Sequence, residues 1–267
     1  MLNLICPLCH SALTQQERQW RCSNQHSYDQ ARQGYLNLLL VQHKRSKQPG
    51  DTPQMLGCRQ AFLDAGHYQP VSKQINQSLA AQTPANLLDM GCGEGYYTAR
   101  LQQALPATAI AGLDISKDAI IKACRRSKSI QWLVGSSARL PAADASLDAL
   151  LCVFSPWSWD ECLRTLKPGG RVLLVGPQAE HLLSLRESLY DQIHPTPDLI
   201  RDCPTGLEIV SDQTLRYALN LNPADLANLI GMTPHGFRSQ PERQQALIEA
   251  GIEGLEVAMR LVMLQRR

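Results

Sequence analysis

The sequence predicts an α/β protein with a doubly wound, mostly parallel sheet and a small metal-binding domain in front of it. From about residue 85, apolar segments of strand length alternate with helical segments, which is the pattern of a parallel sheet covered on both faces. Cysteine and histidine residues cluster in the first 26 positions. We therefore expect a metal-binding ribbon over residues 1–35, a basic linker and helical segment over 36–84, and the α/β domain over 85–267.

Composition narrows the class of protein. The chain has 267 residues, 44% hydrophobic content and a formal net charge of only +2, so a nucleic-acid-binding surface must be local rather than global. The N-terminus has no signal-peptide pattern, and no apolar run approaches the roughly twenty residues of a membrane span. We expect a cytoplasmic protein whose nine cysteines are thiols or metal ligands.

The N-terminal motif has the spacing of a zinc site. Cys6 and Cys9 form a C-x2-C pair, and Cys22 and His26 follow with C-x3-H spacing. Zinc in structural sites binds four such ligands in a tetrahedron, and four protein ligands leave no position open for catalysis. His10 is the alternative fourth ligand, but it directly follows Cys9, where chelation is awkward.

The elements of the α/β domain follow in order. "NLLDM" reads as a strand, "GCGEG" as a turn and "YYTARLQQAL" as a helix. "TAIAGLDIS" is the next strand and "KDAIIKACRRS" the next helix. Strands at "IQWLVG" and "LDALLCVFS" follow, then the helix "WDECLRTL", the turn "KPGG" and the strand "RVLLVGP". Beyond residue 190 we expect turns, a strand region at "LEIVSDQTLRYALNL", a helix at "PADLANLIGM" and a terminal strand, which together cap the active site.

The glycine turn predicts a nucleoside ligand. Gly91, Gly93 and Gly95 let the backbone bend sharply and approach a ligand closely. Tyr96 occupies the position where a dinucleotide fingerprint has its last glycine, which disfavours a pyrophosphate ligand. Asp114 ends the second strand, where a carboxylate can bind ribose hydroxyls. S-adenosylmethionine, a nucleoside without phosphates, fits this pattern.

These segments resemble a known class of enzyme. "LLDMGCGEGYYT", "GLDIS" and "LKPGGRVLLVGP" are similar to the class I methyltransferases that use S-adenosylmethionine, over roughly residues 86–177. The resemblance implies a Rossmann-like fold in which the glycine loop lies near the methionine part of the cofactor. Many such folds carry an acid near the adenine, whereas this chain has Ser136 and Ser137 there.

The order of motifs along the chain is more specific. "CPLCH", "GYLNLL", "VQHKRSKQPGD", "FLDAGHYQP" and "GCGEGYYT" resemble the RlmA family of 23S rRNA (guanine-N1)-methyltransferases over nearly the whole chain. The resemblance implies a zinc ribbon that helps recognise an rRNA hairpin and a homodimer whose cleft holds the RNA. We expect methylation of N1 of guanine 745, with the neighbouring guanine 748 as the alternative.

The resemblance also implies roles for particular residues. Cys6, Cys9, Cys22 and His26 match the zinc ligands, and four further positions match cofactor contacts. With the glycine loop and the strand-end acids, the candidate cofactor-binding residues are Tyr68, Asp89, Gly91, Gly93, Glu94, Gly95, Asp114 and His181. Three of them have an alternative reading: Tyr68 as a packing aromatic on the predicted helix "RQAFLDAGHYQPVSKQINQSL", Glu94 as a helix-start acid and His181 as a surface residue.

The RNA side of the site is less defined. His43, Lys44, Arg45 and Lys47 are candidate phosphate contacts, although a short basic run is equally common in a solvated linker.

The segment "CVFSPW" is expected to present the target base. Phe154 and Trp157 can stack on guanine and the Ser155 carbonyl can accept a hydrogen bond, whereas packing roles are as common for such aromatics. Asp160 is the nearest carboxylate, but the segment itself contains no general base, so the catalytic residue stays unassigned. The rival interpretations are a small-molecule methyltransferase with a purely structural ribbon and a non-enzymatic RNA-binding adaptor.

Overall fold

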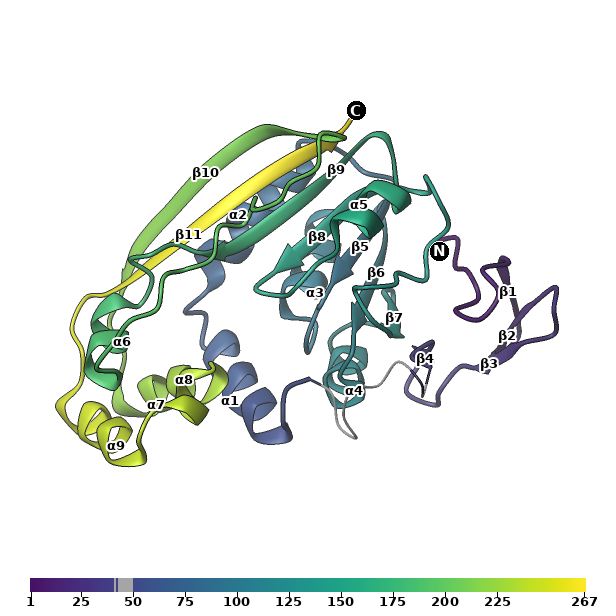
Figure 1. The fold of residues 1–267 in the computed structure, drawn as a ribbon. Helices are drawn as coiled ribbons and strands as arrows, with labels where there is room; N and C mark the ends of the chain where they lie inside the picture. Colours follow the sequence, from purple (N-terminus) through teal and green to yellow (C-terminus); the bar gives the residue numbers. More distant parts are fainter. Residues whose placement is uncertain (41, 43–49) are drawn as a thin grey trace.

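The computed structural model describes residues 1–40, 42 and 50–267. Its centre is an eight-stranded sheet with the order β10-β11-β9-β8-β5-β6-β7-β4 (Figure 1). The parallel strands are β4 (Leu36–Asn37), β5 (Asn86–Met90), β6 (Ala109–Asp114), β7 (Gln131–Val134), β8 (Leu147–Val153) and β9 (Leu166–Pro177). The antiparallel strands are β10 (Leu207–Leu219) and β11 (Leu255–Arg266). This confirms the expected doubly wound, Rossmann-like fold.

Helices cover both faces of the sheet because successive strand residues point to opposite sides. Leu87 belongs to one apolar core and its neighbour Leu88 to the other. In the view of Figure 1, α2 and α3 lie behind the sheet and α5 lies in front of it. The helices are α1 (Pro53–Asp64), α2 (Gln69–Ala80), α3 (Tyr96–Ala104), α4 (Lys117–Arg126), α5 (Trp159–Thr165), α6 (Leu183–Leu189), α7 (Pro223–Met232), α8 (His235–Arg238) and α9 (Pro241–Ala250).

One expected helix is broken in two. The segment around "DAGHYQP" does not continue a single helix, because Gly66 has a φ of +90° and Pro70 stands in the first turn of α2. Proline has no N–H to donate to the preceding turn, so it is favoured at a helix start and not in its interior. Tyr68 is therefore the N-cap of α2, not a mid-helix residue, and it lies at the joint between α1 and α2.

The C-terminal half completes the sheet. "LEIVSDQTLRYALNL" contributes the single long strand β10, and the terminal segment forms β11, which inserts between β9 and β10. β9 begins at Leu166, before the expected turn "KPGG", and its register with β8 shifts between Leu147 and Ala149. Within the described residues, no helix is long and apolar enough to cross a membrane.

The N-terminal ribbon is joined to the sheet domain by backbone bonds. Its strands are β1 (Leu13–Gln16), β2 (Gln19–Cys22) and β3 (Ser27–Asp29), which pair in that order. The Ile5 N–H donates to the Pro141 carbonyl at 3.0 Å, and the Ala143 N–H donates to the Asn3 carbonyl at 3.1 Å. Leu4, 2% exposed, packs in the same core as the inner sheet strands. The ribbon is thus packed against the sheet domain and not connected to it by the chain alone.

Candidate functional site

Four side chains of the ribbon converge on one point. The ligand atoms of Cys6, Cys9, Cys22 and His26 all lie within 4.8 Å of one another. The Sγ atoms of Cys9 and Cys22 are 3.6 Å apart, and Nδ1 of His26 lies 3.4 Å from the Cys22 Sγ. A zinc tetrahedron with bonds of about 2.3 Å has edges of about 3.8 Å, so the donor set fits a zinc ion. His10 is exposed and stands outside the group.

Two tight turns aim these ligands. In the first, the Cys6 N–H donates to the Ser11 carbonyl at 2.8 Å and the Cys6 carbonyl accepts from the His10 N–H. In the second, the Cys22 N–H donates to the His26 carbonyl at 3.1 Å. The Tyr28 hydroxyl lies 3.2 Å from the Cys6 Sγ, where it can donate to a thiolate. With four protein ligands and such support the centre is closed, as structural zinc sites are.

The glycine loop follows β5 and is tightly enclosed. Gly91, Gly93 and Gly95 have φ values of +75°, +56° and +81°. A Cβ on Gly91 would lie 1.9 Å from the Ser155 Oγ, and a Cβ on Gly95 would lie 2.7 Å from the Trp132 ring. Only glycine satisfies both the backbone angle and the contact at these positions.

Asp114, at the end of β6, is fixed by the loop beside it. Its Oδ2 accepts from the Gly93 N–H at 2.9 Å, and its Oδ1 accepts from the Ser116 N–H at 2.7 Å. Burial raises the pKa of this carboxyl, and the two N–H bonds oppose that rise. Each carboxylate oxygen can accept more than one hydrogen bond, so the group is oriented and still has acceptor capacity for ribose hydroxyls.

Asp89, at the end of β5, has an unfilled acceptor. The side chain is 1% exposed; its Oδ2 accepts from the Thr98 hydroxyl at 2.6 Å, while its Oδ1 has no partner among the described residues. Burial is the main cause that raises the pKa of this carboxyl to about 7. A buried acceptor without a donor is costly, and a cationic ligand would satisfy it. Together with Asp114, it makes the loop suitable for S-adenosylmethionine.

Glu94 is engaged within the fold. Its carboxylate lies 3.1 Å from a guanidinium nitrogen of Arg126, whose Nε donates to the Glu94 carbonyl at 3.0 Å. The same guanidinium bonds Asp64 of α1 at 2.9 Å. The glutamate side chain therefore ties the glycine loop to α4 and α1.

Tyr68 and His181 meet although 113 positions separate them. The Tyr68 hydroxyl lies 3.4 Å from the His181 Nε2, and the His181 Nδ1 accepts from the Ala258 N–H at 3.4 Å. Burial lowers the pKa of His181 to about 3, so the imidazole is neutral. Because Nδ1 accepts, the proton is on Nε2, which donates to the tyrosine oxygen.

The expected base-presenting segment divides between two places. Phe154 is 44% exposed with a φ of +55°, and its ring lies 6.2 Å from Tyr68 and 6.4 Å from Tyr97. Trp157 instead contacts Trp159 at 5.5 Å and packs against the other core. The structure therefore groups Phe154, but not Trp157, with the candidate cofactor residues. Asp160 is exposed on α5, and Ser136 bonds the Ala138 N–H at 3.2 Å beyond β7.

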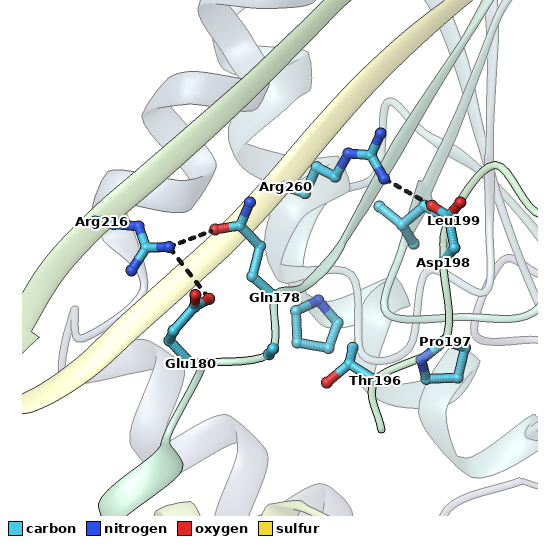
Figure 2. Close-up of a pocket in the computed structure, with 10 residues that line it drawn as sticks. Gln178, Glu180, Thr196, Pro197, Asp198, Leu199, Arg216 and Arg260 are labelled. Atoms are coloured by element: carbon cyan, nitrogen blue, oxygen red, sulfur yellow. Dashed lines mark hydrogen bonds and ion pairs between the residues drawn. The ribbon is translucent and has the colours of Figure 1, made fainter. Parts of the chain in front are cut away.

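A pocket of about 410 Å³ lies at the carboxyl end of β9, next to the turn that leads to His181 (Figure 2). Two arginines from the long strands hold its walls. Arg216 contacts Glu180 at 3.1 Å and Arg260 contacts Asp198 at 2.7 Å. These ion pairs fix the loops on both sides of the pocket to the sheet. Sequence reasoning did not anticipate this pocket, because its walls come from four distant segments.

Comparison with known proteins assigns the two parts of the chain. Residues 4–47 match the family model described as "RlmA, N-terminal", and residues 87–170 match the model of a methyltransferase domain. A 23S rRNA (guanine(748)-N(1))-methyltransferase of Streptomyces fradiae is 32% identical over 90% of this chain and 87% of that protein. A Micromonospora griseorubida relative, named provisionally as a 23S rRNA (guanine-N(1)-)-methyltransferase, is 34% identical over 96% of this chain and 94% of its own length.

Methyltransferases with other named substrates match less of the chain. The malonyl-[acyl-carrier protein] O-methyltransferase of Hahella chejuensis is 28% identical over 44% of this chain and 47% of that protein. Full-length similarity thus extends to the rRNA enzymes, whose match covers the ribbon as well as the sheet domain. The chain belongs to the RlmA family of S-adenosylmethionine-dependent 23S rRNA (guanine-N1)-methyltransferases.

Proposed function

We propose that this protein transfers a methyl group from S-adenosylmethionine to N1 of guanine 745 in a hairpin of 23S rRNA. The observation that carries the proposal is the joining of a closed Cys₃His cluster to the sheet whose carboxyl edge holds the glycine loop and Asp114. A ribbon in this place adds a surface for a large substrate, which a pocket for a small molecule does not require.

The contacts support a role for each residue. Asp114 would bind the ribose, Asp89 would offer its unpaired oxygen to the positively charged part of the cofactor, and the neutral Tyr68–His181 pair would close the site. Glu94 keeps the loop in place through Arg126. When bound, the cofactor supplies an electrophilic methyl group on its sulfonium.

The protein's contribution to the transfer is mainly positioning. Guanine N1 lies on the pairing edge and carries a proton, so the base must be unpaired to enter the site. Phe154, exposed beside Tyr68 and Tyr97, is the stacking surface for that base. Ser155, pressed against Gly91, holds the end of β8 next to the loop. Alignment of the two reacting atoms supplies a large part of the rate in such displacements.

The RNA-binding surface combines the ribbon with the linker. His43, Lys44, Arg45 and Lys47 lie outside the described residues, and we propose them as phosphate contacts on the strength of their charge. We also propose that the chain divides into a ribbon, a linker with helices and a methyltransferase domain. Two copies would assemble as a homodimer around the RNA.

Reverse transcription of 23S rRNA from cells lacking the protein tests the function. N1-methylguanine blocks base pairing and stops the polymerase, so the stop at guanine 745 should disappear and should return with the wild-type chain but not with an Asp114→Asn variant. Loss of a stop at 748 instead would refute the assignment to guanine 745; 748 is the position in the name of the Streptomyces fradiae relative. Persistence of every stop would refute the function.

A further inference from the structure

Tyr97 has a hydroxyl without a partner. It is the second residue of α3, and its ring packs edge-on against Tyr96 at 5.1 Å and near Phe154 at 6.4 Å. The hydroxyl oxygen is buried and makes no hydrogen bond to any described residue. By contrast, the nearby hydroxyl of Tyr68 meets His181 and that of Tyr217 donates to the His67 carbonyl at 2.9 Å. An unsatisfied buried donor costs roughly 1–3 kcal/mol. A ligand that accepts a hydrogen bond from the Tyr97 hydroxyl would remove this cost.

Tyr97 lies at the start of α3, where free backbone N–H groups attract an anion, and the nearby Glu94 carboxylate is already paired with Arg126. α3 begins directly after the glycine loop, and its N-cap Gly95 offers no side-chain cap to the first N–H groups of the helix. These groups and the positive end of the helix dipole lie at the same end of α3 as Tyr97. Burial raises the pKa of Tyr97 well above its usual range, which keeps the phenol protonated as a donor.

The strand order indicates which part of the cofactor reaches Tyr97. β5 lies between β6 and β8 in the sheet. With the ribose on Asp114 at the end of β6, the rest of the cofactor would extend over the glycine loop after β5 toward Phe154 after β8. Tyr97 lies beside Phe154, at the far end of that path. S-adenosylmethionine has one anionic group, the carboxylate of its methionine part, and it lies at the end remote from the ribose.

We propose that the Tyr97 hydroxyl donates a hydrogen bond to the methionine carboxylate of S-adenosylmethionine. The residue is thus a further cofactor-positioning group, and this inference rests on the proposed methyltransferase function. Anchoring the carboxylate fixes one end of the flexible methionine chain while Asp114 fixes the ribose. The sulfonium between the two anchors is then held in place relative to the base on Phe154.

Calorimetry with two ligands and two variants tests the assignment. S-adenosylhomocysteine contains the carboxylate, whereas methylthioadenosine lacks the amino-acid part. Tyr97→Phe should weaken S-adenosylhomocysteine binding about tenfold or more, the effect of losing one hydrogen bond to a charged group. It should leave methylthioadenosine binding unchanged. Tyr96→Phe, on the same helix turn, should change neither. The cofactor-free Tyr97→Phe protein should melt at the wild-type temperature or above, since an unsatisfied donor is removed.

Two outcomes would overturn the proposal. Unchanged S-adenosylhomocysteine binding by Tyr97→Phe would mean that water satisfies the hydroxyl. An equal loss for both ligands would mean that the substitution disturbs the fold of the site. A decarboxylated S-adenosylhomocysteine gives a second measurement on the wild-type chain: it should bind about tenfold more weakly than the parent, and Tyr97→Phe should add no further loss. Because binding is measured without RNA, these results are independent of whether 23S rRNA is the substrate.

Discussion

Replacing Asp89 by asparagine is expected to stabilise the cofactor-free protein at pH 8. The carboxyl is buried, and one oxygen has no partner among the described residues. Asparagine keeps an acceptor for the Thr98 hydroxyl, while it carries no charge to desolvate. The substitution therefore removes the cost of ionising a buried acid and retains the local hydrogen bond.

The size of the effect follows from the pKa of Asp89. Burial raises it to about 7 from the ordinary value of 3.8, so the folded state binds the proton more tightly than the unfolded state. The stabilisation that comes from this tighter proton binding is fully present below pH 3.8 and is lost as the pH rises through 7. About three pH units at 1.36 kcal/mol each give a cost of roughly 4 kcal/mol at pH 8 and about 2 kcal/mol at pH 5.

Urea unfolding at several pH values measures this difference. The free energy of unfolding of Asp89→Asn should exceed that of the wild type by an amount that grows from pH 5 to pH 8. Asp118→Asn, an exposed acid in the first turn of α4, is the control and should show no such growth. A variant less stable than the wild type by a constant amount at every pH would refute the reasoning, because it would mean that the ionised carboxylate is satisfied in the folded protein.

Three further predictions concern the other parts of the site. Cys22→Ser should reduce the bound zinc, measured by elemental analysis, from one ion per chain to a substoichiometric amount. A protease should then cut within residues 1–35, because so small a ribbon needs its metal to stay folded. Asp114→Asn should weaken S-adenosylhomocysteine binding by tenfold or more in calorimetry, while Asp118→Asn should bind normally. Burial holds the pKa of His181 near 3 in the folded protein, so between pH 7 and 5 only the unfolded chain takes up a proton on this imidazole. The free energy of unfolding should therefore fall by about 2 kcal/mol over that range, and His181→Gln should lose this dependence in urea titrations.

The zinc set and the glycine loop were predictable because their geometry is encoded locally. C-x2-C spacing fixes two sulfurs on one turn, and glycines after a strand fix a sharp bend whatever lies further along the chain. The joint between α1 and α2 was also encoded locally, by Gly66 and Pro70, although we expected one continuous helix across it. That prediction was wrong because a glycine and a proline so close together break a helix.

Contacts between distant segments could not be predicted in the same way. Tyr68 meets His181 only because α2 packs on the sheet and β11 inserts beside β9. Nor does the sequence show that the Phe154 ring lies near Tyr68 while Trp157 packs against the other core, since both residues follow the same strand. The unpaired hydroxyl of Tyr97 is visible only once all its neighbours are placed.

A reconstituted reaction tests directly whether this protein methylates guanine N1 of 23S rRNA. The purified zinc-loaded protein is incubated with unmethylated 23S rRNA and S-adenosylmethionine labelled in its methyl group, and the RNA is digested to nucleosides for mass spectrometry. We expect label in 1-methylguanosine, and much less of it at a subsaturating S-adenosylmethionine concentration when Asp114→Asn replaces the wild type. Label in any other nucleoside, or none from a protein that binds S-adenosylhomocysteine normally, would contradict this expectation.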